Sequence, residues 1–406
     1  MKSQISTAPA GKFMGIEGLR GWLAWAVVFS HLTYISAFNA GGISQLLRAI
    51  GLPSVLVFTI VSGFVVTHVV IEKSEGYGPY LVRRFFRIFP LLAVTCFVGF
   101  FSSDLLGIAL ADPSFEDPAF GKVATDVAAS DHSFLGLHLL AHLSMFHAAI
   151  PNSVLMHSEY AFNMPAWSIS LEWQFYLLAP LIVFVLRDRR EFLIPLAIVV
   201  AGSEVAFRMI GSGTAQPGAL PQAATYFAVG IVSRLLYSRK FEAYRGPLLA
   251  LAIMLLPFFQ LWPFMIWLFV LCGLSNDGSD HVARAYRLGL ENSAILYFGS
   301  RSYSIYLCHY PVISMMAWLL FRYSGQPVRM ALLTCASVPL IIAFSELAHR
   351  LIEIPGIALG RYIAVGMHRS TLVSARRSWP ARRTSVIDAS AEPAFVEARK
   401  LSDASG

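Results

Sequence analysis

The stretch Arg20–His31 reads RGWLAWAVVFSH and opens the first long apolar run of the chain. An arginine stands at one end of this stretch and a histidine at the other, inside the run, although both side chains are costly to place in hydrocarbon. Eleven residues make about three helical turns, so the two side chains share one face and lie about 16 Å apart along the axis. Glu17 lies one turn before Arg20 on nearly the same face. We therefore expect a membrane helix with a polar functional stripe.

The composition of the chain points to an integral membrane protein. Of its 406 residues, 56% are hydrophobic and only 14% are charged, whereas a soluble domain averages about 25% charged residues. Such a chain cannot cover a water-facing surface with polar groups. We expect the net charge of +7 to reflect membrane topology rather than nucleic-acid binding. The stretch before Arg20 is polar and short, so no cleaved signal peptide is expected.

Basic clusters indicate which apolar runs cross the bilayer. The clusters fall on one side of the membrane only if the run at 134–150, which is short and rich in His and Ser, does not cross. The sequence thus predicts an all-α integral membrane protein with about ten transmembrane helices, a re-entrant or interfacial helix near 134–150, and both termini in the cytosol. Whether 247–275 forms two full spans is left open, because each part has about 14 residues. The eleven runs lie at 21–38, 50–71, 88–110, 134–150, 167–186, 192–210, 221–237, 247–260, 262–275, 302–321 and 328–350.

We divide the chain into a cytosolic N-terminal segment (1–13), a polytopic membrane domain (14–362) and a basic cytosolic tail (363–406). The tail is rich in Arg, Ser and Ala without an apolar period, and we expect it to be disordered. The four cysteines lie in apolar runs without CxxC spacing. Buried thiols are therefore expected, and neither a disulfide framework nor a metal site. They are Cys96, Cys272, Cys308 and Cys335.

Two arginines stand at the entrance of the third span, in RRFFRIFP. Arg84 and Arg87 are three residues apart and share a helix face. Positively charged anchors on the cytosolic side are one interpretation. A guanidinium group also matches phosphate oxygens, so the pair together with Arg20 could form an anion clamp. With His31 deeper in the membrane, this arrangement suits acyl-coenzyme A, which has a polyphosphate head and a long arm that ends in a thioester.

Two later spans carry further candidate residues. In WSISLEWQFYLLAP (167–180), the topology puts Glu172 in the outer half of a span. There a carboxylate could face an acceptor or orient an imidazole, or it could make a structural contact between helices. In SRSYSIYLCHYP (300–311), His309 and its neighbouring tyrosines are equally consistent with a structural and a functional role.

These stretches together resemble the acyltransferase-3 family of integral-membrane acyltransferases. The motifs stand in the order of the family and cover about residues 14 to 360. Many relatives carry an added soluble hydrolase-like domain after the spans, which we do not expect in this chain. The matching stretches are the Arg20–His31 spacing, FTIVSGF (58–64), RFFRIFP (84–90), WSISLEWQFY (167–176), SYSIYLCHYP (302–311) and RLIEIP (350–355).

The resemblance implies transfer of an acyl group from cytosolic acyl-CoA, usually acetyl-CoA, with no metal ion. It makes His31 the catalytic centre and Arg20 its essential partner, and it makes Arg84 and Arg87 the donor-binding pair together with Arg20. We add Glu172 as a catalytic candidate. Residues expected at the acceptor site or in structural roles are Glu17, Ser62, Trp167, Ser170, Tyr303 and His309.

The sequence therefore predicts an O-acyltransferase of the bacterial cytoplasmic (inner) membrane. The expected acceptor is a saccharide hydroxyl of an exopolysaccharide, O-antigen, lipid-linked glycan or glycolipid. His31 would be a general base or a transient acyl carrier, oriented by Glu172 or Glu17. The expected partners are acyl-CoA, the carbohydrate acceptor and the lipid bilayer, and homo-oligomerisation is left open.

Two alternatives use the same residues. An O-acyltransferase of a small-molecule hydroxyl, such as a macrolide sugar, would need the same donor site. A proton-coupled anion transporter would also place arginines at the cytosolic face and His and Glu inside spans. Carriers often show paired repeats with broken spans, and this sequence shows none, which favours the enzyme.

Overall fold

The computed structural model describes residues 13–73, 75–111, 115–188, 193–210, 216–237, 261–274, 281–321 and 326–378. Within these ranges the chain forms helices and turns and contains no strand, which confirms the predicted all-α class. The helices are α1 (Met14–Ile35), α2 (Gly42–Ala49), α3 (Gly51–Lys73), α4 (Tyr77–Leu110), α5 (Pro118–Ser133), α6 (Leu135–Ser144), α7 (Trp167–Asp188), α8 (Leu193–Ile210), α9 (Leu220–Leu236), α11 (Leu261–Leu274), α12 (His281–Leu290), α13 (Ser293–Ser300), α14 (Ser302–Leu320), α15 (Gln326–Ala348) and α16 (Ile354–Ser378).

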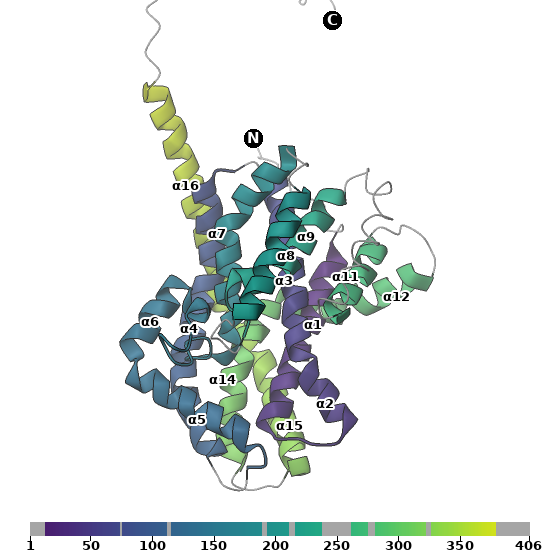
Figure 1. The fold of residues 1–406 in the computed structure, drawn as a ribbon, viewed down its shortest axis with the longest axis vertical. Helices are drawn as coiled ribbons and strands as arrows, with labels where there is room; N and C mark the ends of the chain where they lie inside the picture. Colours follow the sequence, from purple (N-terminus) through teal and green to yellow (C-terminus); the bar gives the residue numbers. More distant parts are fainter. Residues whose placement is uncertain are drawn as a thin grey trace, which may run out of the picture.

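The long helices pack into an elongated bundle (Figure 1). Helix α1 contacts α3, α13 and α14, and α14 lies against α4 and α15. Helix α9 packs along α3, while α16 packs along α4. α16 projects from one end of the bundle, and α5 and α2 lie at the opposite end. This arrangement brings α1, α3, α4, α7 and α14 around one interior space.

Four helical stretches of the described chain are long and apolar enough to cross a membrane, judged by length and composition. The predicted runs at 21–38, 192–210, 221–237, 262–275 and 302–321 are also helical, but they are not among those four. The run at 247–260 lies outside the described residues. The chain is a membrane protein, and the number of ten spans stays a prediction. The four stretches are Gly42–Lys73, Tyr77–Leu110, Met164–Leu186 and Val328–Met367.

The predicted non-crossing segment near 134–150 forms α6, which has ten residues, followed by the 3-10 turn His147–Ala149. Ten residues rise only about 15 Å, half of the hydrocarbon thickness. Leu137, Leu140 and Leu143 are exposed on α6, whereas His138 and His142 are buried. The short length of α6 agrees with a segment that does not cross, and its placement in the bilayer stays a prediction.

Helix α4 is longer than its apolar part. It has 34 residues and begins at Tyr77, so its first three turns precede the predicted span at 88–110. Arg84 and Arg87 therefore lie inside a continuous helix and not in a loop before it. The regular spacing of this helix directs both arginines, together with Tyr80, into the bundle.

Glycines set the closest helix contacts. A Cβ atom on Gly63 of α3 would lie 2.4 Å from the carbonyl oxygen of Phe227, and one on Gly230 of α9 would lie 2.1 Å from that of Ile60. Only residues without a side chain allow backbones to approach so closely in membrane helix pairs. The SGF part of FTIVSGF thus holds α3 against α9.

Helix α16 passes the predicted domain boundary at residue 362 without interruption. It continues to Ser378, so residues 363–378 are helical where the sequence analysis expects a disordered tail. After Pro355 in the first turn of α16, no proline occurs before Pro380, so the helix can continue without interruption. Residues 379–406 lie outside the described residues.

The cysteines are free, and they differ in burial. Cys96 and Cys308 are buried as predicted, whereas Cys272 and Cys335 are exposed. The latter two lie on the outer faces of the apolar helices α11 and α15. An apolar run in the sequence therefore does not by itself predict that a cysteine is buried within the protein.

Candidate active site

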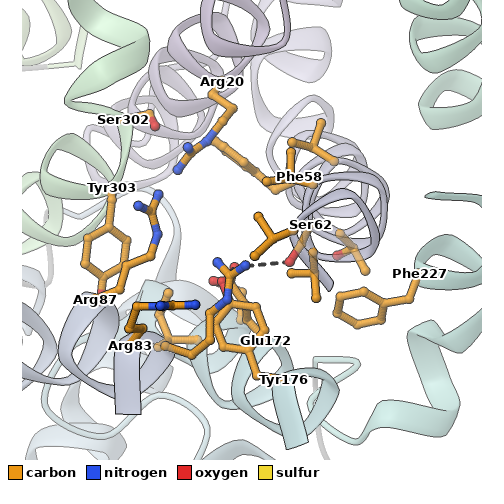
Figure 2. Close-up of a pocket in the computed structure, with 18 of the residues that line it drawn as sticks. Arg20, Phe58, Ser62, Arg83, Arg87, Glu172, Tyr176, Phe227, Ser302 and Tyr303 are labelled. Carbon is orange, nitrogen blue, oxygen red and sulfur yellow. Dashed lines mark hydrogen bonds between the residues drawn. The ribbon is translucent and has the colours of Figure 1, made fainter. Parts of the chain in front are cut away.

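A cavity of about 420 Å³ lies between α1, α3, α4, α7, α9, α14 and α16. Figure 2 shows Arg20, Arg83 and Arg87 reaching into this space from different sides, with Glu172 and Tyr176 across from them. The lining contains six cationic side chains and two carboxylates, so its charge is strongly positive. The cations are Arg20, Lys73, Arg83, Arg84, Arg87 and Arg361, and the acids are Glu75 and Glu172.

The cavity is elongated along α3. Its lining residues on this helix run from Val55 to Lys73 in a stripe with helical spacing. Eighteen residues of α-helix rise about 27 Å. Lys73 is exposed at one end of this stripe, while buried Val55 lies at the other end, where the rings of Phe58 and Tyr306 also line the cavity. The cavity therefore has a cationic, open end and an aromatic, buried end.

The interior arginines are balanced by carboxylates. Arg20 interacts electrostatically with Arg87, Glu172 and Glu353. Arg87 interacts with the same two acids. The two carboxylates and the two guanidinium groups thus form a group without net charge, in which Glu353 is buried and the other three side chains are partly buried. Buried charges are stable only when they are paired in this way.

Glu172 is held by two hydroxyl groups. Ser62 of α3 donates a hydrogen bond to Glu172 Oε1 at 3.2 Å, marked in Figure 2, and the phenol of Tyr176 donates a second, short one. The guanidinium of Arg84 lies 5.0 Å from the centre of the Tyr176 ring and 5.4 Å from that of Tyr80, in cation–π contact with both. These contacts join α3, α4 and α7 in one polar network.

Glu353 comes from a π-helical turn, His349–Glu353, which joins α15 to α16. Ser304 of α14 donates to Glu353 Oε2 at 2.8 Å, and His349 Nδ1 lies 2.9 Å from the same oxygen. The side chain of Glu353 is buried. A π turn is a rare distortion that often accompanies functional sites, and here it delivers a carboxylate to Arg20 and Arg87.

His31 pairs with another histidine. His309 Nε2 of α14 lies 3.0 Å from His31 Nδ1, and His309 Nδ1 lies 3.2 Å from the carbonyl oxygen of Ile305. A carbonyl can only accept, so His309 Nδ1 carries a proton and, in the neutral ring, His309 Nε2 accepts. His31 therefore donates from Nδ1, which leaves the lone pair on its Nε2.

Pro311, two residues after His309, frees a backbone carbonyl of α14. Pro311 has no N–H, so the carbonyl of Leu307 has no partner within the helix. Asn163 Nδ2, from the turn before α7, donates to this carbonyl at 3.1 Å. The motif YLCHYP thus ties α14 to the segment that precedes WSIS.

Tyr306 connects the cavity to the histidine pair. Its ring lines the cavity and lies 6.0 Å from that of His309, measured between centroids. Its hydroxyl is 2.8 Å from both the Pro165 carbonyl oxygen and Ser168 Oγ. His31 and His309 do not line the cavity themselves, and the edge of the Tyr310 ring packs against His31.

The predicted site residues separate into three groups. Arg20, Arg84, Arg87, Glu172, Ser62 and Tyr303 all line the cavity. His31 and His309 form the pair beyond its buried end. Glu17 is exposed on α1, Trp167 belongs to the hydrophobic core, and Ser170 Oγ accepts from the Ala148 N–H at 3.3 Å, so these three lie outside the cavity.

The expected carboxylate partner of His31 is not where the sequence analysis placed it. Glu172 interacts with Arg20 and Arg87, and Glu17 is exposed, so His309 is the side chain that bonds to His31. Sequence reasoning also missed the placement of Glu353, although it lies in the matched stretch RLIEIP. Within the part of the chain that the structure describes, no cluster of three His, Cys, Asp or Glu side chains could hold a metal ion.

The comparisons with known proteins identify the family of the chain. A family model described as an acyltransferase domain matches residues 14–346. The chain is 22% identical over 378 residues to YrhL of Bacillus subtilis (strain 168), to which a peptidoglycan O-acetyltransferase activity is attributed, covering 84% of this chain and 54% of that protein. It is 26% identical over 330 residues to the acyltransferase MdmB of Streptomyces mycarofaciens, covering 73% of this chain and 78% of that protein. The chain thus spans about half the length of YrhL. No solved structure matches.

Proposed function

Because this chain belongs to the acyltransferase-3 family and is an enzyme that transfers acyl groups, we propose that it moves an acetyl group from cytosolic acetyl-CoA to a hydroxyl of a saccharide. Membership of this family argues against the alternative that the chain is an anion transporter. The observation that carries the proposal is the elongated cavity, whose open end is cationic and whose buried end lies next to the His31–His309 pair. Its shape and charge suit a donor with a phosphate head and a thin reactive arm.

The donor would enter with its phosphates at the cationic end. Its pantetheine arm would run along the α3 stripe past Ser62, towards Phe58 and Tyr306. This direction brings the thioester to the end of the cavity that is nearest to His309 and His31. Binding of the remote head group would thus position the reacting group, which is the main use of distant binding energy in catalysis.

His31 Nε2 would then act as the general base. It takes the proton of the acceptor hydroxyl while the oxygen attacks the thioester carbonyl carbon, the C–S bond breaks, and the proton passes to the departing thiolate. His309 would hold His31 in the required tautomer through the Nδ1–H bond. If His31 carried the acyl group instead, Nε2 would attack the thioester first, and His309 Nε2 could receive the proton from Nδ1.

Transfer of radiolabel tests the proposal. Membranes with the protein should move label from [14C-acetyl]-CoA to cellular glycan, and membranes with His31→Ala should not, because loss of a general base costs on the order of 10²-fold or more in rate. The purified His31→Ala protein should still bind CoA in a calorimeter, since His31 does not line the cavity.

A matched control is His132→Ala, because His132 is exposed on α5 and pairs with Asp104 away from the cavity. Label that appears only in a small molecule would exclude the saccharide acceptor. Undiminished transfer by His31→Ala would exclude the catalytic role of the histidine pair.

A further inference from the structure

The open end of the cavity holds a second group of cations, which we call the mouth group and which consists of Lys73, Arg83 and Arg361. They come from the end of α3, the first turns of α4 and the middle of α16. Lys73 interacts electrostatically with Arg83, Arg84 and Arg361, all of the same sign. Lys73 and Arg361 are exposed, and Figure 2 shows Arg83 directed into the cavity.

The mouth group differs from the interior arginines in its charge balance. Arg20 and Arg87 face two carboxylates, so their charges are compensated within the protein. Within the part of the chain that the structure describes, Arg83 is the one member of the mouth group with an acidic partner, which is Glu75. Among the described residues, no carboxylate lies within ion-pair distance of Lys73 or Arg361. Uncompensated like charges that share one cavity are an electrostatic site for an anion.

Arg84 lies between the two groups. It interacts with Arg83 in the mouth group and stacks on Tyr176, the partner of Glu172, in the interior. The cavity thus offers an anion two successive positions along its length, one at Arg84 and one further out at Lys73 and Arg361. A ligand with two separated phosphate groups would fill both.

We infer that the mouth group, Lys73 and Arg361 above all, binds the 3′-phosphate of the coenzyme A donor, while Arg84 binds its diphosphate. The inference rests on the proposed function and assigns one subsite within it. The diphosphate is attached to the pantetheine arm and must follow it inward. The ribose 3′-phosphate is a monoester dianion on the far side of the ribose, and it stays at the opening. Lys73 lies within the matched residues 14–346, whereas Arg361 lies beyond them, so the subsite combines a residue of the matched domain with one of α16.

Binding of two ligands that differ only in this phosphate tests the inference. CoA and 3′-dephospho-CoA are titrated by calorimetry into the purified full-length protein. The wild type should bind CoA roughly 10-fold more tightly than dephospho-CoA, as expected for a charge-assisted contact. Lys73→Gln and Arg361→Gln should each weaken CoA binding and leave dephospho-CoA binding within about twofold of the wild type. The ratio of the two dissociation constants should therefore approach one in both variants.

Two controls separate a specific site from general attraction. Arg287→Gln and Lys122→Gln remove exposed cations that do not line the cavity, and they should leave the preference for CoA unchanged. Binding of dephospho-CoA also reports that each variant is folded. Equal affinity of the wild type for both ligands, or an equal loss for both in the variants, would overturn the inference and leave the proposed function standing. Binding of neither ligand to the wild type would overturn the proposed function as well.

Discussion

His31 and His309 are 278 residues apart in the sequence, yet their rings share a hydrogen bond of 3.0 Å. The helical period predicts that Arg20 and His31 share a face, and that Arg84 and Arg87 do so, because those pairs lie within one helix. No period within one helix predicts which side chain of α14 faces α1. The sequence motif around His309 therefore marked it as a candidate without revealing its partner.

Its contact with His31 makes His309 a candidate positioning residue. We expect His309→Ala to lower kcat on the order of 10²-fold, because His31 Nδ1–H loses its acceptor and the tautomer is no longer fixed. The Kd for CoA should not change, since His309 does not line the cavity. His309→Gln offers a carbonyl oxygen to His31 and should recover part of kcat. An unchanged kcat in His309→Ala, measured with labelled acetyl-CoA, would contradict this role.

Glu172 faces Arg20 and Arg87, and we expect its negative charge, more than its shape, to support transfer. In Glu172→Gln the amide keeps the shape and can still accept from Ser62 and Tyr176, but the charge facing the arginines is lost. We expect transfer to fall at least roughly 10-fold, as for loss of a charge-assisted contact. The protein should reach the membrane at normal levels, because glutamine keeps the shape and both hydrogen bonds and Glu353 still faces the two arginines.

The matched control for this variant is Glu346→Gln, which removes a carboxylate that pairs with Arg301 and Arg350 away from the cavity. Initial transfer rates and membrane abundance are measured for both. Near-normal transfer by Glu172→Gln would leave Glu172 only a structural role.

At the scale of helices, the sequence predicts the long apolar elements well and the short amphipathic ones poorly. The predicted spans correspond to α1, α3, α4, α7, α8, α9, α11, α14 and α15. Helices α2, α5 and α12 were not predicted, because a search for apolar runs passes over helices that are apolar on one face only. The π turn at His349–Glu353 was missed as well, since local sequence signals for such turns are weak.

The contact between α3 and α9 should be sensitive to a single methyl group. In Gly230→Ala the new Cβ would lie 2.1 Å from the Ile60 carbonyl oxygen, and backbone atoms cannot move aside without separating the helices. Overpacking of this kind costs about 1–3 kcal/mol, so we expect a lower Tm in detergent. Ser62 lies next to Gly63 and lines the cavity, so a shift of α3 should also lower the transfer rate.

The control for this variant is Gly202→Ala in α8, where a Cβ would meet no atom within 4 Å. Alanine in place of glycine inside a free helix surface stabilises by roughly 0.5–1 kcal/mol. Its Tm should therefore be equal to or higher than that of the wild type. A Gly230→Ala protein as stable as Gly202→Ala would show that α3 and α9 are less closely packed than described.

For the whole molecule, the distribution of arginines predicts its orientation in the membrane. With all four native cysteines replaced, a cysteine at exposed Ala119 in α5 should react with an impermeant maleimide added outside intact cells. A cysteine at exposed Arg287 in α12 should react only after the cells are opened. Labelling of Arg287→Cys in intact cells would reverse the predicted orientation or change the number of crossings between the two sites.

The contribution of α16 to the cavity bears on how this enzyme can be shortened or fused. The matched acyltransferase domain ends at residue 346, yet Glu353, Ile357 and Arg361 follow it and reach the polar interior or the cavity lining. A chain cut at residue 346 would keep every motif up to SYSIYLCHYP and still lose one of the two carboxylates that neutralise Arg20 and Arg87. A C-terminal fluorescent protein or affinity tag should therefore be joined well beyond Arg361. When membrane domains are exchanged between relatives, the exchanged segment should include α16.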